Sequence, residues 1–181
     1  MKANPTPFYA AIACASSLLC VGTARSHDTP PAQLDQLSGF LGDGLCTGRM
    51  LAAKSPHPTT GKFHGERMLG DLWIVVRYDQ DATGADPRPY HVIQYLGYDR
   101  KAGRLVDVVL DNSGSSYATG TSSGWQGDVM TFENMDSTGG GKAPFRDVFT
   151  RQGGKVVSHA GYWRDQRGQW VKGDEETCRR P

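Results

Sequence analysis

The chain lacks an excess of charge of either sign. Its 181 residues hold 20 Lys and Arg against 19 Asp and Glu, and no run of basic residues disturbs this balance. Proteins that bind nucleic acid or anionic lipid electrostatically need clustered Lys and Arg to neutralise phosphates. We therefore expect no nucleic-acid partner and no charged membrane-binding surface.

A long hydrophobic run is also missing, which argues against a spanning helix near the start. Lys2 is followed by an uncharged stretch over residues 8–22, about 15 residues, whereas a transmembrane helix needs about 20 apolar residues. The small residues Gly22, Thr23 and Ala24 suit cleavage after Ala24. We predict a signal peptide over residues 1–24 and a periplasmic or secreted mature protein, with no membrane insertion after cleavage. A membrane anchor, and a lipoprotein modified at Cys20, are the less favoured alternatives.

Cysteine is scarce, and cleavage would leave only two of the four. It would also remove Lys2 and no acidic residue, leaving 19 basic and 19 acidic residues. The remaining thiols, Cys46 and Cys178, are expected to pair in an oxidising compartment. Closing a loop of about 130 residues would stabilise the fold by about 4 to 5 kcal/mol in the chain-entropy model. Two separate buried thiols remain an alternative, and a zinc site is disfavoured because neither cysteine has a second ligand at a metal-binding spacing.

Long helical segments are absent beyond residue 42, which leaves the mature chain to strands. Before that point, Leu34, Leu37 and Leu41 fall at the i, i+3 and i+7 spacing of a helical stripe, so residues 25–42 are predicted to form a lead and a short helix. The remainder, residues 43–181, is predicted to be one β-barrel domain.

Ten β-like runs follow, separated by hairpin-like clusters of Gly, Asp and Asn. They cover residues 44–53, 62–69, 71–78, 90–99, 104–112, 115–123, 125–134, 145–152, 155–165 and 169–178. A row of hairpin-linked strands exposes two edges unless it closes. The predicted fold class is therefore all-β: a closed antiparallel up-and-down barrel of about ten strands, in which Cys46 and Cys178 would join the first strand to the last.

Several of these segments resemble a known family. They are residues 95–99 (YLGYD), the strand at 105–111, the turn at 112–114 and the Thr-Gly strand at 117–120, with residues 37–39 (LSG) and 68–73 upstream. Together they resemble the bacterial lipocalin-like family known as domain of unknown function 1579. The resemblance implies a lipocalin-type barrel with no established reaction, and it supplies no catalytic residues.

A barrel of this size encloses room for one small molecule, and such cavities are lined by aromatic side chains with a few polar groups. Arg77 would hold an acidic ligand group if it pointed inward, or mark the solvent face if it did not. The aromatic residues would otherwise simply pack the core. The predicted ligand-binding residues are Trp73, Arg77, Tyr95, Tyr98, Trp125 and Trp163.

No histidine pair or acid stands at a metal-ligand spacing, so we predict no catalytic residue, metal or cofactor. The leading hypothesis is a lipocalin-like protein that binds a small apolar ligand. One alternative is a small-molecule enzyme, either haem-dependent through His159 or isomerase-like. Another is a structural envelope protein with a filled barrel.

Overall fold

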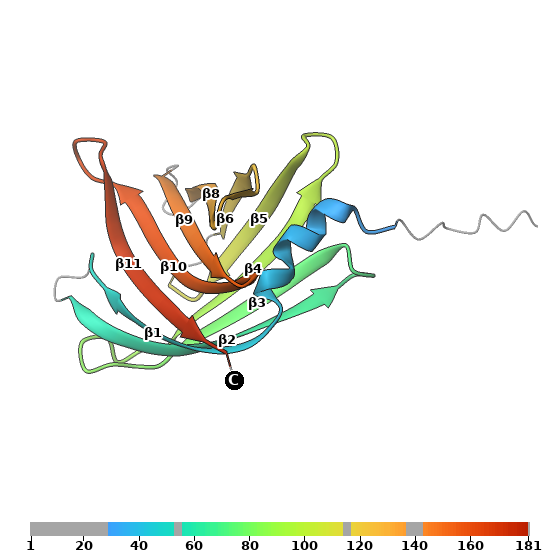
Figure 1. Cartoon of the computed structure of the whole chain (residues 1–181). Coiled ribbons are helices and arrows are strands. Elements are labelled where there is room, and N and C mark those ends of the chain that lie inside the picture. Colours follow the sequence, from blue (N-terminus) through green and yellow to red (C-terminus); the bar gives the residue numbers. More distant parts are fainter. Residues whose placement is uncertain (1–28, 53–55, 114–116, 137–142, 181) are drawn as a thin grey trace, which may run out of the picture.

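The computed structural model describes residues 29–52, 56–113, 117–136 and 143–180 (Figure 1). The predicted signal peptide, residues 1–24, lies outside this part of the chain. Within the described residues, no helix is both long and apolar enough to cross a membrane.

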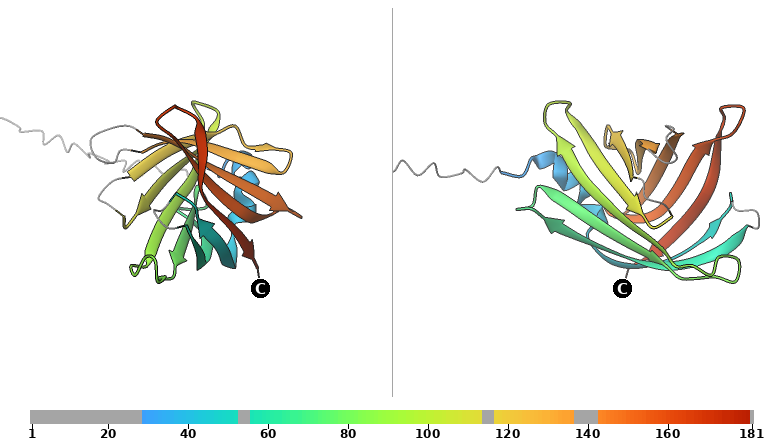
Figure 2. Two further views of the ribbon diagram at one scale, coloured as in Figure 1. Left: turned by 90° about the vertical axis from the view of Figure 1, so that its left-hand side faces the viewer. Right: turned by 180° about the vertical axis from the view of Figure 1, so that it is seen from behind.

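Ten antiparallel strands form a closed barrel, as predicted from the sequence (Figures 1 and 2). Neighbours in sequence are neighbours in space, and the ring closes through β1 with β11 and β6 with β8. A two-residue strand, β7 (Trp125–Gln126), pairs with β8 alone. The ten strands are β1 (Gly42–Met50), β2 (His57–Met68), β3 (Trp73–Gln80), β4 (Tyr90–Asp99), β5 (Arg104–Asp111), β6 (Tyr117–Ser122), β8 (Val129–Asp136), β9 (Ala143–Gln152), β10 (Lys155–Arg164) and β11 (Trp170–Arg179).

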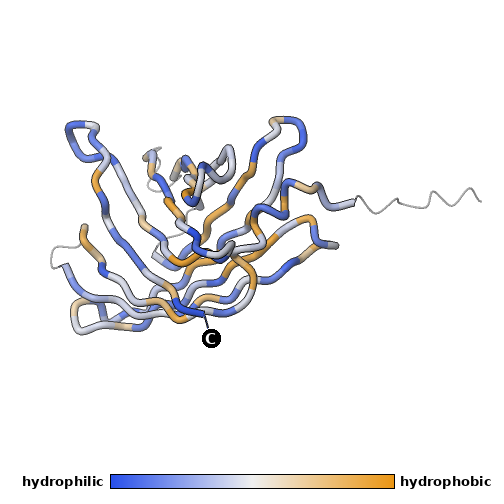
Figure 3. The backbone as a smooth tube through the Cα atoms, viewed as in Figure 1, coloured by the Kyte–Doolittle hydropathy of each residue, from blue (hydrophilic) through white to orange (hydrophobic). Residues whose placement is uncertain are grey.

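Alternation along each strand decides which side chains enter the barrel. In β5, Leu105 and Asp107 are buried whereas Leu110 is 41% exposed. Figure 3 shows hydrophobic and hydrophilic positions interleaved along the strands in the same way. The inward set is not purely apolar, because Asp107 belongs to it.

One short helix, η1 (Ala32–Phe40), plugs one end of the barrel, at the right of Figure 1. It is a 3₁₀ helix with three residues per turn, so its buried face repeats every third residue: Leu34, Leu37 and Phe40. The predicted stripe had Leu41 as its third member because it assumed α-helical spacing. Leu41 instead lies just beyond the helix and is only partly buried against the same core.

The hydrophobic core gathers at the helix end. The rings of Phe40 and Phe149 pack edge to face, with their centres 4.9 Å apart. A hydrogen bond from Trp125 Nε1 to the Gln36 carbonyl at 2.7 Å holds the helix there, and one from Arg100 to the Thr29 carbonyl at 2.6 Å holds the segment just before it. The core residues are Leu34, Leu37, Phe40, Ile74, Leu96, Leu105, Met130, Phe132, Phe149 and Val156.

The predicted disulfide between Cys46 and Cys178 is confirmed. The two cysteines are directly opposed in the register of β1 with β11, so the bond joins the first strand to the last. The backbone ladder and the covalent bond therefore close the ring at the same place.

Reducing this disulfide is expected to lower the free energy of unfolding by about 5 kcal/mol, because the bond closes a loop of 132 residues in the unfolded chain. Urea unfolding with and without reductant measures the change, and the Cys46→Ser, Cys178→Ser double variant is the matched comparison. An unchanged urea midpoint in both would contradict the expectation.

Candidate functional site

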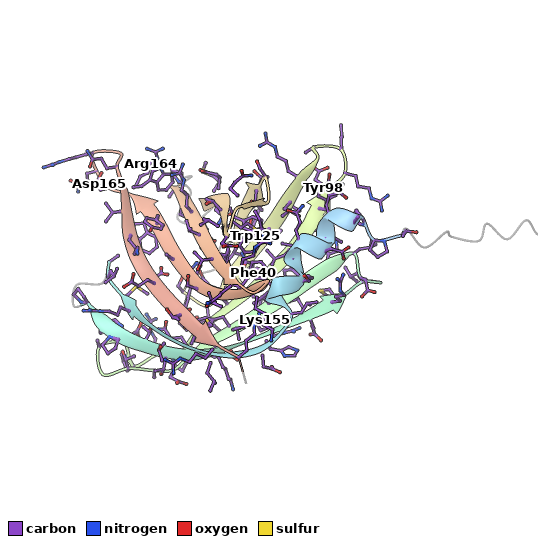
Figure 4. All side chains as sticks on the ribbon, viewed as in Figure 1. Phe40, Tyr98, Trp125, Lys155, Arg164 and Asp165 are labelled. Atoms are coloured by element: carbon purple, nitrogen blue, oxygen red, sulfur yellow. A yellow bond between two sulfur atoms is a disulfide. The ribbon has the colours of Figure 1, made fainter. Side chains whose placement is uncertain are left out.

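The end of the barrel opposite η1 holds a cavity of about 1040 Å³. Phe40, Phe149 and Val156 of the core form its floor. Its rim includes Arg88 in the β3–β4 connection and Arg164 at the end of β10. Figure 4 shows Arg164 at one end of the barrel and Tyr98 at the other. The core thus fills one half of the interior and leaves the other half open.

The wall formed by β3 to β6 has an apolar strip among polar side chains such as Tyr78, Gln80 and Asp111. Val76, Val92, Val109 and Ala118 line the cavity from these four strands. In a ring of ten strands, β4 lies across from β10 and β5 lies across from β11. The opposite wall, from β9 to β11, is built quite differently.

His159 on β10 lies at the centre of that second wall, between two carboxylates. Its Nε2 is 2.8 Å from Asp147 Oδ1 on β9, and its Nδ1 is 3.5 Å from Asp174 Oδ1 on β11. The side chains of these three residues are 26%, 13% and 21% exposed, so the pairs are shielded from bulk water. The other Asp147 oxygen accepts a hydrogen bond from Asn134 at 2.6 Å.

A third carboxylate, Glu176, lies two residues beyond Asp174 on the same face of β11. It accepts a hydrogen bond from the Tyr78 hydroxyl, which reaches it from β3 across β2 and β1. Gly61 makes this reach possible, because a Cβ there would lie 2.7 Å from the Tyr78 hydroxyl oxygen. His159, Asp147, Asp174 and Glu176, hereafter the acidic wall, all line the cavity.

The acidic wall shifts the ionisation of its own members. Burial alone would lower the pKa of His159, but the hydrogen bond to Asp147 and the charges of Asp147, Asp174 and Glu176 outweigh it and raise the pKa to about 9. Burial also raises the pKa of Asp174 and Glu176 above the ordinary values. His159 is therefore a cation at neutral pH, facing carboxylates that lack full compensation.

A second buried carboxyl, Asp107, lies between the core and the acidic wall. It is 1% exposed, and its Oδ2 accepts a hydrogen bond from Gln94 at 2.9 Å. Its Oδ1 and the Oδ1 of Asn134 have no partner among the described residues. Both crowd Gly120, where a Cβ would lie 2.5 Å and 1.5 Å from them, so only glycine fits.

Two orphan acceptors over one glycine are best satisfied by a proton between them. Burial, and then the charge of Asp147, raise the pKa of Asp107 to about 7. Asn134 donates its amide N–H to Asp147, and a proton on Asp107 would supply the donor that the Asn134 oxygen lacks. The acidic wall is thereby linked by hydrogen bonds to the layer below it.

The structure separates the six residues that the sequence analysis selected. Trp163 lines the cavity near its mouth. Arg77 is on the outer face, 2.6 Å from Glu66, and the ring of Trp73 packs over Gly97. None of the remaining three lines the cavity: Tyr98 and Trp125 pack against the core, and Tyr95 lies on β4.

Sequence reasoning missed the acidic wall, although a signal was present. Asp174 and Glu176 precede Cys178 at intervals of two, so all three share one face of a strand. Placing the cysteine at the seam would have placed both carboxylates with it. The sequence analysis names His159 only as a candidate haem ligand, and nothing in the sequence places Asp147 of the neighbouring strand beside it.

Asp107→Asn should flatten part of the pH dependence of stability. The folded-state pKa of Asp107, about 7, lies above its ordinary 3.8, so its stabilising contribution is fully present below about pH 4 and is lost as pH rises through 7. Between pH 4 and pH 8 the wild type should lose roughly 4 kcal/mol of unfolding free energy that the variant does not lose. The difference in unfolding free energy, variant minus wild type, should therefore rise by that amount. Urea unfolding across this range tests it; a difference that does not vary with pH would refute the shared proton.

His159 should titrate near pH 9 in an NMR titration of its ring resonances. Because its folded-state pKa is raised, its contribution to stability is fully present below about pH 6.5 and is lost as pH rises through 9. Asp147→Asn should return the pKa toward 6.5. A value near 6.5 in the wild type would contradict the pairing.

Comparison with known proteins gives a family and a fold. The family model described as "Protein of unknown function (DUF1579)" matches residues 30–180. The crystal structure of Rv2717c from M. tuberculosis is similar, with a TM-score of 0.62 and 17% identity over 84% of this chain and 99% of that one; this likeness concerns the fold. None of the curated proteins compared with the chain matches it. The chain belongs to the DUF1579 family, as its resemblance at the sequence level indicated.

Proposed function

We propose that the protein binds a small molecule, with a substantial apolar part, in the open half of the barrel. The observation that carries this proposal is the cavity of about 1040 Å³ beside a separately packed core. Ligand cavities in proteins typically measure about 300 to 1,000 Å³. Burying an apolar surface of that extent supplies the driving force for binding.

The two walls suit an amphiphilic occupant. Its apolar part would lie on the valine-rich wall of β3 to β6 and on Phe40 and Phe149 at the floor. Its polar part would meet the acidic wall, where a few oriented side chains fix its position. The disulfide supports the accompanying proposal that the protein works in an oxidising compartment, the periplasm or the exterior.

The two alternative functions are less well supported. A filled barrel would leave no cavity of this size. A histidine that ligates haem iron must offer a neutral imidazole nitrogen. Both ring nitrogens of His159 instead face carboxylates, which keep the ring protonated and leave no nitrogen for iron. The geometry therefore favours a binding protein.

Val109→Trp should abolish binding of a neutral apolar dye such as Nile red, because the indole would occupy the cavity next to the β5 wall. We expect at least about a tenfold loss of affinity in a fluorescence titration. Leu110→Trp is the matched control: it is the next residue on β5, 41% exposed and outside the cavity, so it should bind like wild type.

Thermal unfolding of both variants confirms that each remains folded, and Val92→Trp on β4 replaces Val109→Trp if that one does not. Failure of wild type to take up the dye, or equal binding by both tryptophan variants, would count against a ligand site inside the barrel.

A further inference from the structure

The acidic wall carries more negative than positive charge. Asp147 and His159 form a close pair, but Asp174 shares that same imidazolium at the longer distance of 3.5 Å. Glu176 is hydrogen-bonded to the neutral hydroxyl of Tyr78. Three carboxylates thus share one cation in a setting largely removed from water, where uncompensated charge is costly.

The three arginines that line the cavity do not neutralise the acidic wall. The Arg164 guanidinium lies 4.5 Å from the centre of the Trp170 ring. Arg49 is paired in the β-sheet register with Glu175 and lowers its pKa. The side chain of Arg88 is 86% exposed at the rim. None of these three has a described ion pair with the acidic wall.

Two further polar side chains, buried and without a partner, line the same cavity. Thr59 on β2 is 3% exposed, and Gln80 on β3 is 6% exposed. Neither makes a side-chain hydrogen bond with any described residue. Gln80 follows Tyr78 by two residues and shares its face of β3. Because both side chains line the cavity and are not bonded to other side chains, their hydroxyl and amide groups can hydrogen-bond to an occupant.

We infer that the occupant is an ammonium ion joined to an apolar body: a protonated amine held by Asp174 and Glu176. This inference rests on the proposed function and specifies its ligand. A protonated amine carries a positive charge and up to three N–H donors, and the carboxylate, hydroxyl and amide oxygens around it all accept. A carboxylate ligand of the same shape would be repelled by the acidic wall.

The experiment compares three probes that share one apolar chain: decylammonium, decanol and decanoate. Isothermal titration of the purified protein at pH 7 should give at least about tenfold tighter binding of decylammonium than of decanol, with decanoate the weakest. Glu176→Gln should reduce the preference for decylammonium over decanol roughly tenfold. Glu175→Gln is the matched control on the same strand, because Glu175 pairs with Lys172 and does not line the main cavity.

The outcomes separate this inference from the proposed function. Equal binding of all three probes, or tightest binding of decanoate, overturns the cation preference and leaves an apolar binding site standing. Binding of none refutes both. An equal effect of Glu176→Gln and Glu175→Gln overturns the role of the acidic wall, and Asp174→Asn provides the same comparison if Glu176→Gln does not fold.

Discussion

The packing of one short helix into one end of the barrel determines how the rest of the structure is used. A closed ring of ten strands encloses more space than the inward side chains of a single layer readily fill. Leu34, Leu37 and Phe40 of η1 supply the missing volume at one end. The opposite end receives no such element from the described residues, and its interior remains a cavity.

Between these two halves the inward positions change from apolar to polar. Above the core, each strand continues its alternation, and the next inward residues include Gln94, Asp107, Asn134, Asp147 and Glu176. Hydrogen bonds from Gln94 to Asp107 and from Asn134 to Asp147 offset part of the cost of burying this layer next to the core. Where this layer faces the cavity, the carboxylates of the acidic wall are not fully compensated by positive charge. They give the cavity one acidic side.

The outline of the fold was predictable, because the pattern of strands and turns in the sequence indicates a closed antiparallel barrel. Ten runs, hairpin turns and a cysteine at each end together required the first strand to meet the last, and they do. The site was less predictable. The candidate residues were chosen by residue type, without a known strand register. Trp73 and Arg77 do not line the cavity, because a one-residue change in register exchanges the two faces of a strand. His159 was named as a haem candidate, but its pairing with Asp147 and Asp174 depends on the registers of β9, β10 and β11, which the sequence does not give.

One strand, β11, carries both the seam and the carboxylates: Cys178, Glu176 and Asp174 lie at successive inward positions. Cross-linking and occupancy are consequently linked through the same segment of backbone, and such linkage is reciprocal. If the proposed occupant binds the cross-linked barrel more tightly than the reduced one, it must make the disulfide harder to reduce to the same extent. Any such difference would let the redox potential of the compartment shift the affinity for the ligand.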